Sequence, residues 1–93
     1  MPYKRILPSI SEKLTPEDAF GRVLRERRLA LGLTQAELEA QGGLEQSYIS
    51  RLEAGRYQVC LRGILLLARA LGMTSADLMQ EVEKRLNGSE VER

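Results

Sequence analysis

The residues best suited to chemistry with another molecule lie between positions 46 and 54, where polar and apolar side chains recur with a helical period. Ile49 and Leu52 are three residues apart, so in a helix they point to the same side. The opposite side carries only polar side chains, namely Gln46, Ser47, Ser50 and Arg51. Amide, hydroxyl and guanidinium groups hydrogen-bond to base edges and phosphate oxygens. Taken alone, the pattern fits either a helix that binds nucleic acid or an ordinary solvated helix face.

A second short helix is expected directly before this one, from Thr34 to Gln41. Thr34 and Glu37 have the spacing of a capping box, in which each side chain accepts a hydrogen bond from the other residue's backbone N–H. The Gly42-Gly43 pair supplies the conformational freedom of a tight turn. Two short helices joined by such a turn form a helix-turn-helix, whose second helix can enter a groove about 12 Å wide.

Three further helices are expected to hold this pair in place. Thr15-Pro16 has the composition of a helix start, and glycines at 32 and 72 are typical helix stops. We find no internal repeat and no strand-like alternation, so the predicted fold is an all-α bundle of about five helices. The expected helices span 15–31, 34–41, 46–54, 61–71 and 74–86. They form one domain over 15–86, with an N-terminal arm over 1–14 and a C-terminal tail over 87–93.

Composition limits the classes of function that remain. The chain has 93 residues, of which 43% are hydrophobic and 29% charged, as in an ordinary single globular domain. The formal net charge is only +1, so any nucleic-acid binding must come from the local placement of arginines, and non-specific binding should be weak. No stretch resembles a signal peptide or a membrane span, and we expect a cytoplasmic protein.

The metal-ligating and nucleophilic side chains are few. The chain has no histidine and a single cysteine, Cys60, so neither an internal disulfide nor a Cys/His zinc site is possible. Cys60 is expected to be a small buried hydrophobic residue or a loop residue, and a redox switch is the less favoured interpretation. With no nucleophile motif and no paired-carboxylate pocket expected, we predict neither an enzyme nor a bound cofactor or metal.

At this point residues 20–71 resemble the Cro/phage-repressor helix-turn-helix family, also called the Xre family. The segments LTQAEL, QSYISRLEAG and LLLARALG match the family pattern in order and at the right separations. The resemblance implies the five-helix fold of phage-repressor DNA-binding domains. It also implies a sequence-specific regulator of transcription, a dimeric repressor, that reads the major groove of double-stranded DNA with helix 46–54.

The resemblance also implies a role for each matching residue. Base contacts are expected from Gln46, Ser47 and Arg51, since glutamine pairs with adenine and arginine with guanine. Phosphate contacts are expected from Gln35, Tyr48, Ser50 and Arg56. Gln35 is also expected to brace the recognition helix, while the Tyr48 ring could instead pack on the turn. An ion pair between Arg28 and Glu53 is expected to tie the first helix to the end of the third. In the run Arg22, Arg25, Arg27 and Arg28, most side chains should be solvated and one or two could touch phosphate.

Three positions depart from the family pattern. Gly42 stands where the family has a small apolar residue that packs the turn, and Glu45 stands where it has a Ser or Thr cap. The loop from Tyr57 to Cys60 lacks the family's proline and its Ser cap. These departures concern the geometry of the turn and the loop contacts rather than the fold.

Some apolar residues have no obvious use inside one domain. The expected last helix carries a stripe of Met79, Val82 and Leu86, and Leu66 stands where the family has a polar residue. We expect these four residues to form a homodimer interface, although the stripe could instead fold onto the domain's own core. A dimer would read a palindromic operator, and Val82→Asp would then give folded monomers.

Two classes of function remain. The first is a DNA-binding regulator, with phage-type repressor, controller of a restriction-modification operon and DNA-binding antitoxin as possible settings. The second is a protein-interaction module that reuses the fold, such as an antitoxin whose main partner is a toxin. The low net charge and the 1–14 arm favour the second class, and the polar face of helix 46–54 favours the first.

Overall fold

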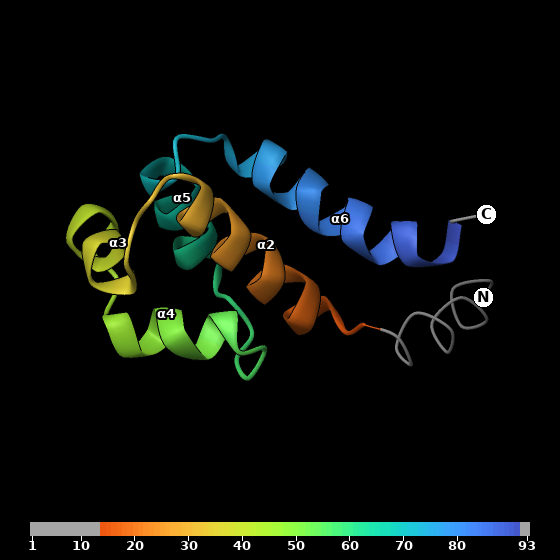
Figure 1. Ribbon diagram of the computed structural model, residues 1–93, viewed down its shortest axis with the longest axis horizontal. Helices are drawn as coiled ribbons and strands as arrows, with labels where there is room; N and C mark the ends of the chain where they lie inside the picture. The colour runs from red at the N-terminus through yellow and green to blue at the C-terminus, as the bar shows by residue number, and fades with distance from the viewer. Residues whose placement is uncertain (1–13, 92–93) are drawn as a thin grey trace.

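Five helices make up residues 14–91, the part of the chain that the computed structural model describes (Figure 1). They are α2 (Pro16–Ala30), α3 (Gln35–Gly42), α4 (Gln46–Glu53), α5 (Leu61–Ala70) and α6 (Ser75–Val91). No strand occurs among these residues, which confirms the predicted all-α fold. The helix ends agree with expectation except at the C-terminus, where α6 continues to Val91, inside the segment 87–93 that we predicted to be a tail. The predicted arm lies outside the described residues except for Leu14, which is buried.

Side-chain caps explain why several helices begin where they do. Thr15 and Asp18 form a capping box at α2, and Thr34 and Glu37 form another at α3, where the Glu37 backbone N–H donates to Thr34 Oγ1 over 3.0 Å. These bonds satisfy backbone donors that a helix start otherwise leaves free. Glu45, which stands where the family has a Ser or Thr cap, precedes α4 and forms no side-chain cap hydrogen bond.

One hydrophobic core joins all five helices. Its largest fully buried side chains are Leu24, Leu38, Ile49, Leu52, Leu67 and Leu78, and every helix supplies at least one of them. Burying a leucine or isoleucine side chain completely stabilises a fold by roughly 1.5–3 kcal/mol. Because α4 supplies both Ile49 and Leu52, one side of this short helix is anchored in the core and the other is left to solvent.

The apolar stripe of α6 packs on this same core, which corrects our expectation of a dimer interface there. Val82 is only 4% exposed and is a core residue, while Met79 and Leu86 are half-buried against the core. Leu66 is also half-buried, on a helix that contacts α3. Helical period told us which face of α6 is apolar, but not that α2 and α5 would cover it. We therefore no longer expect Val82→Asp to give folded monomers, because an unpaired charge in a core is destabilising.

No helix in the described range is both long enough and apolar enough to pass through a membrane. An ion pair on the surface joins the two longest helices, since Nη1 and Nη2 of Arg85 in α6 donate to the carboxylate of Glu26 in α2. This pairing lowers the pKa of Glu26.

Gly42→Ala is expected to stabilise the protein by about 0.4–1 kcal/mol. Gly42 is buried at the end of α3, and an added Cβ would meet Ala70 Cβ at 3.4 Å, an ordinary van der Waals contact. Alanine also reduces the conformational freedom of the unfolded chain. Urea denaturation measures whether the substitution raises or lowers the free energy of unfolding. The matched control is Gly43→Ala, which should destabilise because Gly43 has a φ of 79°. Stabilisation by Gly43→Ala, or destabilisation by Gly42→Ala, would contradict this account of the turn.

Candidate nucleic-acid interface

Helix α4 lies along one edge of the bundle (Figure 1), and its outer face is polar and exposed to solvent. Ile49 and Leu52 on its inner face are both 0% exposed. Its exposed residues include all four of the polar side chains that the sequence predicted, Gln46, Ser47, Ser50 and Arg51. The structure thus places the expected base-reading residues together on the accessible side of one helix.

A glycine in α2 sets the position of the end of α4. A Cβ on Gly21 would lie 2.4 Å from the carbonyl oxygen of Leu52 and 2.8 Å from that of Glu53. Real Cβ atoms do not approach backbone oxygens this closely, so the two helix backbones meet at a distance that only glycine allows. The sequence analysis did not identify Gly21, because nothing local in the chain distinguishes it from a glycine elsewhere.

Hydrogen bonds among three polar side chains also hold the end of α4 in place. Arg28 donates from Nε to Glu53 Oε2 over 2.7 Å and from Nη2 to Glu53 Oε1 over 2.9 Å, while its Nη1 donates to the carbonyl oxygen of Leu33. Gln35 Nε2 also donates to Glu53 Oε1, over 3.0 Å. The side chains of the ion pair are only 9% and 4% exposed. The hydrogen bonds to Glu53 raise the pKa of Arg28. Glu53 therefore connects α4 to both α2 and α3.

Tyr48 connects α4 to the start of α5. Its hydroxyl accepts a hydrogen bond from the backbone N–H of Cys60 over 3.2 Å and donates to Cys60 Sγ over 3.6 Å. A phosphate contact by the Tyr48 hydroxyl would need the proton that it donates to sulfur. The half-buried ring also packs against the hydrophobic core, whereas our alternative interpretation placed it on the turn.

Cys60 takes the capping position that the family fills with serine. Its Sγ accepts from the Gly63 backbone N–H over 3.3 Å, so the thiol caps α5. Cys60 is exposed and lies in the loop before α5, so of our two expectations the loop residue is correct and the buried hydrophobic residue is not. The hydrogen bonds from Tyr48 and Gly63 lower the pKa of its thiol, because they stabilise the thiolate.

Tyr57, in the loop after α4, contacts Arg51 and was missed by the sequence analysis. The Arg51 guanidinium carbon lies 5.3 Å from the centre of the Tyr57 ring, and Arg51 Nη1 donates to the Tyr57 hydroxyl over 3.4 Å. The only signal in the sequence was an aromatic residue close behind a helix that carries an arginine. The path of the loop, which the sequence does not define, brings the two together.

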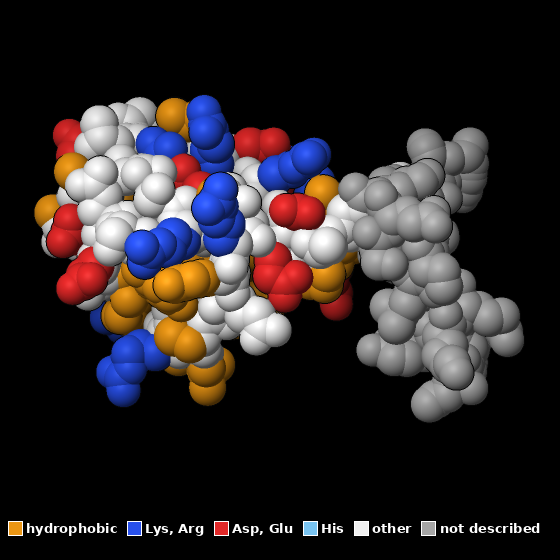
Figure 2. All heavy atoms as spheres, turned by 90° about the horizontal axis from the view of Figure 1, so that it is seen from below, with side chains coloured by type: hydrophobic (Ala, Val, Ile, Leu, Met, Phe, Trp, Pro, Cys, Tyr) orange, Lys and Arg blue, Asp and Glu red, His pale blue; other side chains and the backbone are white. Residues whose placement is uncertain are grey.

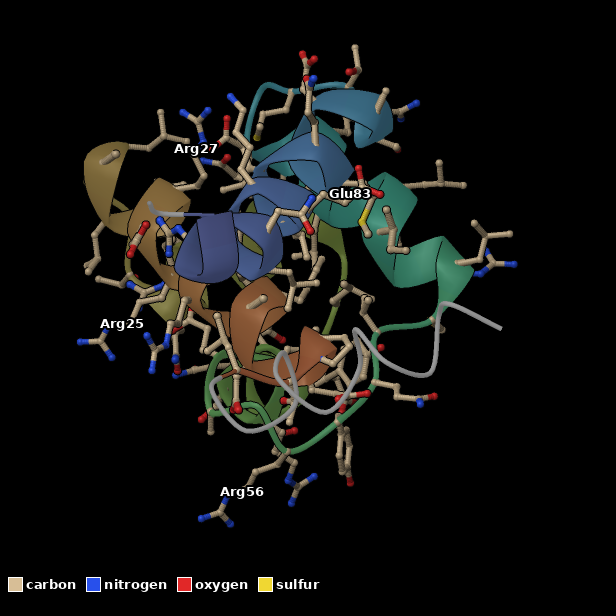
Figure 3. All side chains as sticks on the ribbon, turned by 90° about the vertical axis from the view of Figure 1, so that its right-hand side faces the viewer. Arg25, Arg27, Arg56 and Glu83 are labelled. Atoms are coloured by element: carbon tan, nitrogen blue, oxygen red, sulfur yellow. The ribbon has the colours of Figure 1, made fainter. Side chains whose placement is uncertain are left out.

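Three further arginines, Arg25, Arg27 and Arg56, point in different directions. Arg56 is exposed and projects from the loop below α4 (Figure 3). Arg25 projects outward from α2, and Arg27 points to the side away from α4 (Figure 3). Seen from the side of α4, basic side chains lie next to a group of hydrophobic ones (Figure 2). Arg56 and Arg25 are therefore better placed than Arg27 to reach a ligand bound at α4.

Among residues 14–91, no cluster of three or more His, Cys, Asp or Glu side chains has the arrangement of a metal site. The face of α4 consists instead of hydrogen-bonding groups on a rigid helix. Such a face can bind the edges of base pairs, while basic side chains around it bind phosphates.

Known proteins are similar to this chain in sequence. A family model described as a helix-turn-helix domain matches residues 19–82. A helix-turn-helix-type transcriptional regulator of Sinorhizobium fredii, y4dJ, is 38% identical over 65 residues, which are 70% of this chain and 79% of that protein.

Two solved structures are similar to most of this chain. The clp gene regulator ClgR of Corynebacterium glutamicum has a TM-score of 0.76 at 28% identity, over 84% of this chain and 83% of that chain. The restriction-modification controller protein C.AhdI of Aeromonas hydrophila has a TM-score of 0.64 at 42% identity, over 67% of this chain and 94% of that one.

Proposed function

The chain belongs to the helix-turn-helix family of DNA-binding transcriptional regulators, of the Cro/Xre type, and from this premise we propose that it is a dimeric repressor that binds a palindromic operator. Proteins of this family are not enzymes. The observation that carries the proposal is the face of α4, where four exposed polar side chains stand on a helix fixed from behind by Ile49, Leu52 and Glu53.

Each side chain of this surface has a proposed role. Gln46, Ser47 and Arg51 read base edges in the major groove, because amides and guanidinium groups form paired hydrogen bonds with adenine and guanine. Ser50, Arg56 and Gln35 hold phosphates. Gln35 can do so while bonded to Glu53, since its amide nitrogen carries a second N–H. In place of the phosphate contact we first expected, Tyr48 braces α4 against α5 through Cys60.

Similarity supports a proposal for the biological setting. The 42% identity to the controller protein C.AhdI favours control of a restriction-modification operon over the phage and antitoxin settings.

Arg51→Ala is expected to remove base preference at one position of each half-site and to cost about 1–3 kcal/mol of binding free energy there. Gln35→Ala is the matched control and should weaken all sequences alike, because phosphate contacts carry little sequence information. The measurement is the affinity of each variant for duplexes with all four bases at each site position. Uniform weakening by Arg51→Ala would mean that this side chain holds only phosphate.

We place the dimer interface on α5 rather than on α6. Leu61 and Leu65 are 72% and 52% exposed and, being four residues apart, lie on the same face of α5. A single recognition helix covers about half a turn of DNA, so two protomers on half-sites roughly 34 Å apart are needed for a full operator. Burying these leucines across a two-fold axis favours this association.

Leu65→Glu is expected to give monomers that stay folded, because the side chain that it replaces lies outside the core. Leu29→Glu is the control and should stay dimeric, since Leu29 is about as exposed as Leu65 but lies on α2. Val82→Asp, by contrast, should unfold the protein. Analytical ultracentrifugation measures whether each variant is a dimer, and thermal melting measures whether it is folded. A monomeric wild-type protein at tens of micromolar, or a Leu65→Glu variant that stays dimeric, would rule out this interface.

A further inference from the structure

We infer that Tyr57 positions Arg51 for base reading and thereby sets part of the sequence specificity. The inference rests on the proposed function, since it concerns how a proposed base-reading side chain is held. Tyr57 lies in the loop between α4 and α5, outside the helix that carries the predicted base-contacting residues.

Two contacts of different kinds hold the guanidinium group. Its carbon lies 5.3 Å from the centre of the Tyr57 ring, within the range of a cation–π interaction. Its Nη1 also donates to the Tyr57 hydroxyl over 3.4 Å. An arginine has five N–H donors, and a guanine edge takes two of them. The contact with Tyr57 therefore leaves enough donors to bind a base.

Tyr57 is itself held by its neighbours. Its ring lies 6.1 Å from the ring of Tyr48, tilted by 53°, which is a favourable geometry for two aromatic rings. The Tyr48 hydroxyl is in turn bonded to the backbone of Cys60 at the start of α5. A continuous set of contacts thus runs from Arg51 through two tyrosines to α5, which anchors an otherwise mobile side chain.

This anchoring affects recognition because an unrestrained arginine has many rotamers and must lose that freedom when it binds a base. An arginine already held over a ring loses less freedom on binding. A cation–π interaction at an exposed site corresponds to a factor of roughly two to five in an equilibrium constant. Removing the Tyr57 ring should therefore lower base discrimination by about that factor.

The experiment uses the duplex that the full-length wild-type protein selects from a random-sequence library. For wild type, Arg51→Ala, Tyr57→Ala, Tyr57→Phe and the Arg51→Ala/Tyr57→Ala double variant, Kd is measured with each of the four bases at each position. We expect Tyr57→Ala to lower discrimination about two- to fivefold, only at the positions that Arg51→Ala affects. Tyr57→Phe keeps the ring and should retain most of the discrimination between bases. The double variant should discriminate as Arg51→Ala does.

The controls distinguish an effect on the position of Arg51 from a loss of protein stability and from a general loss of DNA binding. Gln58→Ala, an exposed neighbour in the same loop, should leave every Kd unchanged, and thermal melting identifies any variant that is not folded. Tyr57 is 45% exposed and is not a core residue, so we expect its variants to fold.

Three outcomes would overturn the inference. If Tyr57→Ala weakens all sequences equally, or if its effect adds to that of Arg51→Ala, Tyr57 does not act through Arg51. If Arg51→Ala itself changes no base preference, the proposed role of Arg51 and the inference fail together. The Arg51→Ala result therefore distinguishes failure of the proposed function from failure of the inference alone.

Discussion

Glu53→Ala is expected to lower the free energy of unfolding by about 3–5 kcal/mol, the range for breaking a buried ion pair. The substitution removes the carboxylate that receives two hydrogen bonds from Arg28 and one from Gln35. Arg28 is 7% exposed, so its charge would remain in a largely dry site with only the Leu33 carbonyl as a partner. Chemical denaturation followed by circular dichroism gives the value directly.

The chain offers a matched control for this prediction in its second ion pair between helices. Glu26→Ala breaks the contact with Arg85, in which the side chains are 56% and 35% exposed, and should cost only about 0–1 kcal/mol. Replacing both members of the buried pair, as in Arg28→Met/Glu53→Leu, should recover much of the loss, because no unpaired charge is then buried. If Glu53→Ala costs no more than Glu26→Ala, the buried network does not stabilise the junction.

Gly21→Ala is the second substitution with a large expected effect, a net loss of about 2–3 kcal/mol, the upper part of the usual range for overpacking. Alanine is the better helix former by up to ~1 kcal/mol, but its Cβ would lie 2.4 Å from the Leu52 carbonyl oxygen. A backbone oxygen inside a packed helix can move only if α4 moves with it. We therefore expect the clash to outweigh the gain in helix propensity.

The same substitution should also weaken DNA binding on all sequences alike, because it displaces α4 without altering its polar face. Gly88→Ala in α6 is the control: nothing lies within 4 Å of the added Cβ, and the variant should be as stable as wild type or more so. Thermal melting and affinity for the selected duplex test both effects. Equal stability of the Gly21→Ala and Gly88→Ala variants would contradict the proposed close packing.

The fold was predictable because its signals are local. Capping residues such as Thr15 and Thr34 fix helix starts, and the spacing of Ile49 and Leu52 identifies the inner face of α4. The end of α6 was predicted too early, since a single glycine at position 88 costs only about 1 kcal/mol in a helix and did not end it.

The site was predictable only in part. Residue types on one helix gave its polar face, and the family resemblance gave the pairing of Arg28 with Glu53, which lie 25 residues apart. The contact between Tyr57 and Arg51 depends on the path of a loop, and the burial of Val82 depends on which helices cover α6. Neither is encoded in a local pattern, so neither could be obtained from the sequence alone.

The central claim is that α4 reads DNA sequence as part of a symmetric dimer. The most direct measurement is selection of bound duplexes from a random-sequence library by the purified wild-type protein at about 0.15 M salt, near physiological ionic strength. We predict one enriched site made of two inverted half-sites whose centres lie about one helical turn, roughly 34 Å, apart. Enrichment of no sequence, or binding that is equal for all duplexes and vanishes with added salt, would contradict the account, because phosphate contacts alone produce that behaviour.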